Sequence, residues 1–118
     1  MGVSKSRVED AAKARLSADI VGYALGTPSS DILSEGKGAP DAVFARQVAM
    51  YLCYTGFALS LARVAVAFER DRSTVSYACH RIEDRRDDAA FDQWIESLEA
   101  MVRQAPLEAV AAPHCVQP

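Results

Sequence analysis

Cysteine and histidine are scarce in this chain of 118 residues, and long apolar runs are missing. Its three cysteines, Cys53, Cys79 and Cys115, are too few and too scattered for a disulfide framework. The two histidines, His80 and His114, form no cluster with metal-ligand spacing, so we expect no metal site. No apolar run approaches the roughly 20 residues that span a bilayer, and the polar start has no apolar signal segment. These absences predict a cytoplasmic protein that does not enter membranes.

A phosphate loop of the form G-x-x-x-x-G-K-[ST] is also missing, so we expect neither a bound nucleotide nor another cofactor. The sequence shows no plausible set of acid, base and nucleophile, so we do not expect an enzyme. Half of the residues are hydrophobic and a quarter are charged, which is typical of a folded domain. The length suits one small domain with its own core, in which we expect Cys53 and Cys79 to be buried.

Charge is distributed unevenly, although the net charge is only −3. Residues 1–36 contain four basic and five acidic side chains, residues 37–86 contain eight and five, and residues 87–118 contain one and six. The middle segment is therefore at +3 and the last at −5. Because charges act over a Debye length of about 10 Å, the local sign decides whether phosphate is attracted. The middle segment is compatible with a nucleic-acid partner.

Helical patterns cover most of the chain, and no strand pattern occurs. The expected helices span residues 6–25, 41–55, 60–68, 72–83 and 88–104, with a short turn within 30–33. Their expected N-caps are Ser30, Asp41, Ser60 and Asp71, and Gly56 is the expected stop of the second long helix. This predicts an all-α, compact fold with a flexible N-terminus (1–5), one domain (6–104) and a disordered, proline-containing tail (105–118).

Apolar periodicity predicts which helix faces are buried. Helix 41–55 is apolar nearly all round and should lie at the centre. The first helix should bury a stripe formed by Val8, Ala12, Leu16, Ile20 and Tyr23. The last helix should bury Phe91, Trp94, Ile95, Leu98, Met101 and Val102, with Asp92, Glu96 and Glu99 facing elsewhere.

The stretch "ERDRSTVSYACHRI" (69–82) has two distinct helical faces. Its apolar face consists of Val75, Ala78, Cys79 and Ile82, at i, i+3, i+4 and i+7. The opposite face presents hydroxyl, imidazole and guanidinium groups and no carboxylate. Two short amphipathic helices, 60–68 and this one, are joined by about three residues. That spacing is typical of a helix-turn-helix, whose second helix enters the DNA major groove.

Three segments resemble the C-terminal DNA-binding domain, domain IV, of the bacterial replication initiator DnaA, which has a Trp repressor-like fold. They are "ARQVAMYLC" (45–53), "SLARVAVAF" (60–68) and "RDRSTVSYACHRIE" (70–83). The resemblance covers about residues 8–104 and implies a duplex-DNA partner. The initiator's ATPase module has no counterpart here, and its basic loop is thinned to Lys37 and Arg46.

The resemblance also implies roles for individual residues. Asp71, Arg72, Ser73 and Thr74 would face base edges in the major groove, and Arg46 would enter the minor groove. Arg72 stands where the family usually has histidine, and an arginine there can pair bidentately with guanine. Four residues would contact phosphate, which positions the protein without reading sequence: Arg63, Tyr77, His80 and Arg81. The whole set expected at DNA is Lys37, Arg46, Arg63, Arg70, Asp71, Arg72, Ser73, Thr74, Tyr77, His80 and Arg81.

Three functions remain open at this level. The first is a sequence-specific regulator of transcription, an activator that needs a protein partner to reach RNA polymerase. In size and content the chain is similar to the DNA-binding part of the activators of gene transfer agents. The second is a modulator of replication initiation that competes at initiator sites. The third is a helical protein-interaction adaptor that has kept the fold and lost DNA binding.

Overall fold

The computed structural model describes residues 5–36 and 38–105 of the chain. The expected disordered tail and flexible N-terminus, with Lys37, Cys115 and His114, therefore lie outside the described residues, apart from Lys5 and Ala105 at their edges. Within the described ranges the chain forms six helices and no strand. They are α1 (Lys5–Leu25), α2 (Ser29–Leu33), α3 (Pro40–Thr55), α4 (Leu61–Phe68), α5 (Arg72–Arg85) and α6 (Ala89–Gln104). The all-α prediction is confirmed.

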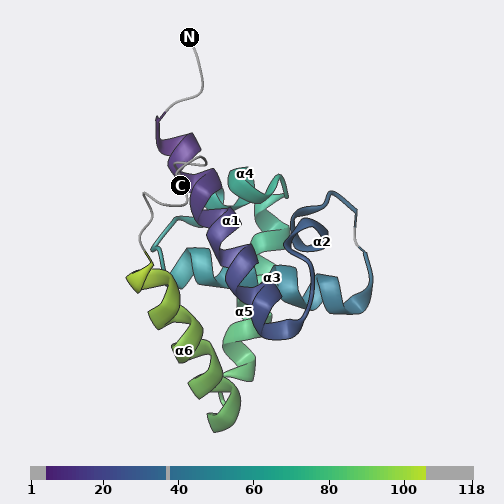
Figure 1. Cartoon of the computed structure of the whole chain (residues 1–118), viewed down its shortest axis with the longest axis vertical. Coiled ribbons are helices and arrows are strands. Elements are labelled where there is room, and N and C mark those ends of the chain that lie inside the picture. Colours follow the sequence, from purple (N-terminus) through teal and green to yellow (C-terminus); the bar gives the residue numbers. More distant parts are fainter. Residues whose placement is uncertain (1–4, 37, 106–118) are drawn as a thin grey trace, which may run out of the picture.

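Helix α3 forms the centre of the domain, as its apolar sequence predicted. It packs against each of the other five helices. Figure 1 shows α1 lying across it, with α2 and α6 on opposite sides. Nine of its residues are buried, among them Val48, Leu52 and Cys53, which have no exposed surface. The core is therefore built around one helix that every other element covers.

The buried face of α1 differs from the predicted stripe. Val8 is 52% exposed and Tyr23 is 90% exposed, so the large apolar side chains at these positions lie outside the core. The face that is buried instead consists of Asp10, Ala14, Ser17, Ala18, Val21 and Gly22. Small side chains allow α1 to approach α3 closely, and the hydroxyl of Ser17 lies 3.4 Å from the sulfur of Cys53. Close approach of the backbones outweighs the pattern of large residues here.

The expected N-caps are confirmed only in part. The hydroxyl of Ser60 accepts a hydrogen bond from the backbone N–H of Arg63, as predicted. The capping hydrogen bonds expected from Ser30, Asp41 and Asp71 are not formed. Helix α2 begins one residue before Ser30, after Pro28, and α3 begins at Pro40, so Asp41 falls within its first turn. Asp71 occupies the N-cap position of α5, but its carboxylate makes no capping hydrogen bond.

The end of α3 requires a glycine for space. Gly56 is the C-cap residue, as predicted, yet its φ of −75° is that of an ordinary right-handed residue. A Cβ at this position would lie 2.5 Å from Cγ2 of Val102 and 2.7 Å from the carbonyl oxygen of Leu52. Gly56 therefore allows α6 to pack directly against the end of α3.

Helix α6 is oriented as predicted, with two exceptions. Ile95, Leu98 and Val102 are buried, but Met101 is 46% exposed. Glu99, expected to face elsewhere, is only 6% exposed. It accepts hydrogen bonds from Thr55 at 2.7 Å and from Arg86 at 3.0 Å, and this pairing compensates the cost of burying its charge.

Candidate nucleic-acid interface

The exposed surface of α5 brings together most of the residues that the sequence predicted to meet DNA. Asp71 at the N-cap and six residues along one side of α5 are all exposed. We call those six the reading face; they are Arg72, Ser73, Thr74, Tyr77, His80 and Arg81. The reading face contains two guanidinium groups and no carboxylate, as expected.

The opposite side of α5 fixes the reading face in place. Val75, Ala78, Cys79 and Ile82 are at most 6% exposed, as their spacing predicted, and pack against α3 and α4. Burial raises the pKa of Cys79 to about 11 and that of Cys53 to about 12, so both thiols stay protonated and unreactive at neutral pH. Both cysteines are core residues, as predicted.

The first turn of α5 leaves backbone donors available. Because Asp71 makes no capping bond, the N–H groups at this end have no side-chain acceptor. An exposed helix N-terminus of this kind favours anions such as phosphate. Arg72, in the same turn, makes no side-chain hydrogen bond or ion pair with any described residue. The N-terminal end of the reading face is thus free to bind a ligand.

Further along α5, side chains support one another. Nη1 of Arg81 donates to the hydroxyl of Tyr77 at 3.2 Å, and its guanidinium lies 5.8 Å from the centre of the tyrosine ring. Nδ1 of His80 lies 2.8 Å from the carbonyl oxygen of Ser76. These contacts restrict three long side chains, which reduces the entropy that a ligand would have to order.

The structure does not bring Arg46 to the surface, which corrects the expected minor-groove contact. Arg46 is 5% exposed. Its guanidinium donates to the carbonyl oxygens of Ile32 at 2.7 Å and Asp31 at 3.1 Å. Burial, together with the nearby charge of Arg70, lowers its pKa. Arg46, which the resemblance placed in the minor groove, therefore joins α3 to α2 in this structure.

Two further arginines of the predicted set are also engaged within the fold. Arg63 forms a two-pronged pair with the buried carboxylate of Asp10, at 2.9 and 2.7 Å, which raises its pKa. Arg70 donates to three backbone carbonyls of the turn after α2. Neither guanidinium has its full set of donors available for phosphate.

The positive charge available for a ligand is smaller than the sequence suggests. Of the eight basic side chains in residues 37–86, four are committed to acceptors within the fold: Arg46, Arg63, Arg70 and Arg86. Lys37 lies outside the described residues. Arg72, Arg81 and Arg85 are exposed, and Arg85 packs over the rings of Phe44 and Phe91. We therefore assign the attraction for phosphate mainly to α5.

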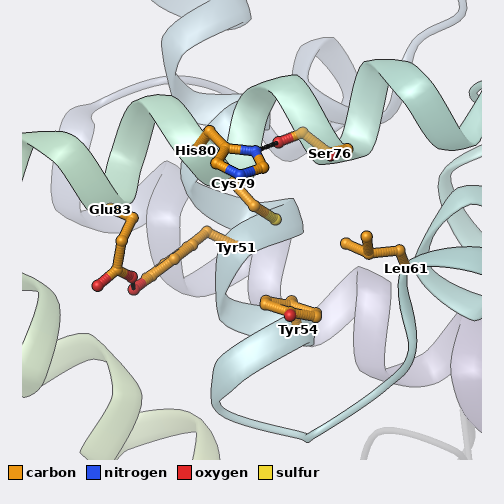
Figure 2. A pocket seen from close by; sticks show the side chains of 7 residues that line it. All are labelled: Tyr51, Tyr54, Leu61, Ser76, Cys79, His80 and Glu83. Atoms are coloured by element: carbon orange, nitrogen blue, oxygen red, sulfur yellow. Dashed lines mark hydrogen bonds between the residues drawn. The ribbon is translucent and has the colours of Figure 1, made fainter.

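Two hollows flank α5 and include residues that the sequence reasoning missed. A groove of about 500 Å³ lies between α3 and α5, and its lining includes Gln47 and Met50 from α3 and Thr74 and Tyr77 from α5. A pocket of about 250 Å³ on the other flank is lined by Tyr51, Tyr54, Leu61, Ser76, Cys79, His80 and Glu83. Figure 2 shows the side chain of Tyr51 extending toward Glu83 of α5, where its hydroxyl donates to the carboxylate. The sequence signal for Gln47 and Tyr54 is a polar group on a helix whose residues are mostly apolar.

The described residues contain no helix long and apolar enough to cross a membrane. Among these residues there is also no group of three or more potential metal ligands.

Helices α4 and α5, the turn that joins them and the exposed polar side of α5 together define a helix-turn-helix domain. Residues 18–82 match the family described as "Bacterial dnaA protein helix-turn-helix". The chain therefore belongs to the DnaA helix-turn-helix family and is a homologue of the C-terminal, domain IV, region of DnaA. Both the fold prediction and the resemblance are confirmed.

Individual relatives agree with this assignment. The chromosomal replication initiator protein DnaA of Lachnoclostridium phytofermentans is 31% identical over 90 residues, which are 75% of this chain and 20% of that protein. DnaA 2 of Chlamydia pneumoniae is 37% identical over 76 residues, or 62% of this chain and 17% of that protein. The chain thus spans about a fifth of the length of these relatives.

Solved structures agree as well. A crystal structure of a DNA replication initiation factor superposes with a TM-score of 0.71 and 29% identity, over 80% of this chain and 29% of that one. A replication initiator DnaA bound to AMPPCP and single-stranded DNA superposes with a TM-score of 0.69 and 26% identity, over 86% and 30%.

Proposed function

We propose that this chain binds duplex DNA sequence-specifically through the reading face of α5 and regulates transcription. The observation that carries the proposal is the state of Arg72, Ser73 and Thr74. They stand on a helix anchored by its apolar side, they are exposed, and Arg72 has no partner among the described residues. Membership in the DnaA helix-turn-helix family supports a DNA ligand.

Each part of the reading face has a chemical role in this proposal. Arg72 pairs bidentately with guanine in the major groove, and Thr74 or Ser73 contacts a thymine methyl group or a base acceptor. Tyr77, His80 and Arg81 contact phosphate, which positions the helix without reading sequence. Arg46 is left out of this interface because its guanidinium is bound to carbonyls of α2.

A second candidate function is modulation of replication initiation. The family relationship to replication initiators favours it, because a homologue of the reading domain can occupy the same sites. Arg72, where histidine is usual in the family, favours a different site and hence the regulator. If the regulator acts like the DNA-binding part of a gene transfer agent activator, we propose that a protein partner contacts RNA polymerase.

The test is a selection from sheared DNA of the organism's own genome, in which retained fragments are sequenced. The wild type is compared with an Arg72→Ala, Thr74→Ala double variant. Arg15→Ala is the matched control, because it removes the same charge from an exposed position on α1. We expect the wild type and the control to enrich promoter fragments that share a motif, and the double variant to lose them.

Other results discriminate between the candidates. Enrichment at the replication origin would favour the modulator of initiation over the transcription regulator. No retention at low salt would overturn DNA binding and leave the protein-interaction adaptor.

A further inference from the structure

Arg70 lies in the turn between α4 and α5, directly before Asp71, the N-cap residue of α5. Its Nη1 donates to the carbonyl oxygen of Glu35 at 2.7 Å, and its Nη2 donates to those of Ser34 and, at 3.3 Å, Gly36. One side chain thus joins three consecutive residues of the turn after α2 to the start of α5. These segments are more than 30 residues apart in the sequence.

A second guanidinium holds the preceding carbonyls. Arg46 donates to the carbonyl oxygens of Asp31 and Ile32, at the end of α2. The last carbonyls of a helix have no partner within it. The carbonyl oxygen of Asp31 also accepts from the backbone N–H and the hydroxyl of Ser34, so Arg46 adds to a local turn at the end of α2. Burial lowers the pKa of Arg46, and the charge of Arg70 contributes to the same shift. This arrangement costs electrostatic repulsion and fixes the path of the chain through residues 31–36.

The three residues that Arg70 holds are themselves exposed. They form a surface turn that is held by hydrogen bonds from Arg70. Arg70 in turn directly precedes Asp71 and Arg72, at the start of α5. The Nε of Arg70 is buried and makes no hydrogen bond among the described residues, so the side chain is held by its two terminal nitrogens. A guanidinium fork is suited to this task, whereas a single ammonium is not.

We propose that Arg70 is a positioning residue, which holds the turn of Ser34–Gly36 beside the N-terminal end of α5. The turn and the reading face then meet duplex DNA as one surface, and the turn lies against the backbone next to the base pairs that α5 reads. This inference rests on the proposed function, but the tie itself is a property of the free protein.

The first measurement needs no DNA. Backbone ¹⁵N relaxation is recorded for Glu35 and Gly36 in the wild type, Arg70→Lys and Arg70→Gln, with Arg15→Lys as the matched control. We expect order parameters near those of rigid backbone, about 0.85, in the wild type and the control. In both Arg70 variants we expect them to fall toward about 0.6, while the amides of α3 are unchanged. Unchanged values in the variants would overturn the tie.

The second measurement uses a duplex enriched in the genomic selection. Hydroxyl-radical footprints of the wild type and Arg70→Lys are compared at equal occupancy. We expect Arg70→Lys to lose protection on the flank beside the α5 site and to keep it across the α5 site. Retention of the whole footprint would mean that a charge suffices, as in a direct phosphate contact, and would overturn the positioning role. A uniform loss would indicate a general structural defect and would overturn it as well.

The two measurements separate failure of the inference from failure of the proposed function. If no duplex is retained by the wild type, DNA binding is wrong, while relaxation still decides whether Arg70 holds the turn. If the wild type binds and relaxation changes without a change in the flanking footprint, the tie exists but does not position the turn on DNA.

Discussion

The two ends of α5 use the same residue type in opposite ways. At the N-terminal end, Arg72 is exposed and has no side-chain partner among the described residues. At the C-terminal end, the side chain of Arg86 is 17% exposed and donates to Asp92, Glu99 and Tyr51. Burial lowers the pKa of Arg86, but its hydrogen bonds to Asp92, Tyr51 and Glu99 outweigh this and raise it.

This contrast separates arginines that maintain the fold from those that are available to a ligand. A guanidinium whose donors are already bound gains little from phosphate, because the existing bonds would first have to break. The contacts of Arg86 at the C-terminal end of α5 also help to orient the N-terminal end of the helix. Since α3 and α6 hold the last turn of α5 through Arg86, the first turn is presented at a fixed angle. Positive charge in the sequence is therefore a poor guide to the interface until the pairing is known.

Removing the anchor should have the largest effect. Arg86→Ala leaves the buried carboxylate of Glu99 without its cation, and loss of one partner of a buried pair costs about 3–5 kcal/mol. Thr55 continues to donate to Glu99, so we expect the lower part of that range. Urea unfolding followed by circular dichroism should show a lower midpoint. Arg72→Ala is the control and should change the free energy of unfolding by less than about 0.5 kcal/mol. A similar loss in both variants would remove the distinction between the two ends.

The sequence predicted the helices well because each has its own local signal. All five expected helices begin and end within two residues of the expected positions, and the buried side of α5 matches its periodicity. The helix-turn-helix follows from the short spacing between α4 and α5, which is also a local property. Helix existence and the core side of α5 could thus be read without a structure.

The pairing of the arginines could not be predicted in the same way. Arg63 is 53 residues from Asp10, and Arg70 is 35 from Glu35, so neither pattern nor spacing brings these groups together. The prediction of the buried side of α1 was wrong for a related reason. Ala14 and Ala18 are buried because α1 approaches the core closely, which depends on its partners and not on its own large residues. Tertiary contacts therefore decide which of the predicted site residues are paired within the fold and which are available to a ligand.

The salt dependence of DNA binding tests how many cations are available. If Arg81 and one to three further cationic groups displace counterions from the DNA, about two to four counterions are released. The slope of log K against log salt should then be about −1.8 to −3.6, so a fourfold increase in salt weakens binding roughly 12- to 150-fold. Fluorescence anisotropy with an enriched duplex measures this slope. A slope near −7 would mean that the paired arginines also bind phosphate, so that pairing within the fold does not decide which arginines contact DNA.

Substitutions of Arg72 test the free end directly. Arg72→Ala should weaken binding to the enriched duplex by about 1–3 kcal/mol, because a bidentate contact with guanine is lost. Arg72→Lys keeps the charge without the fork and should recover the salt slope but not the preference for guanine. Arg81→Ala is the comparison, since loss of a phosphate contact should weaken all duplexes alike. Equal effects of Arg72→Ala on matched and mismatched duplexes would argue that Arg72 only contacts the backbone.

The smallest predicted effect concerns Glu69, which ends α4 in a left-handed conformation with φ of 55° and ψ of 47°. This conformation costs a residue with a Cβ about 1–2 kcal/mol, part of which glycine recovers, so Glu69→Gly should stabilise the fold by about 0.5–1 kcal/mol. Glu69 also lines the groove that contains Thr74 and Tyr77, so losing its carboxylate should strengthen DNA binding a fewfold, to about the extent of a surface charge contact. Glu69→Ala separates the two causes, because it removes the charge and keeps the Cβ. We expect it to match Glu69→Gly in affinity, measured by anisotropy, without the gain in unfolding midpoint. If Glu69→Ala gains no affinity, the charge beside the first turn of α5 does not influence DNA binding. The part of the surface that affects affinity would then be limited to Arg72 and its immediate neighbours.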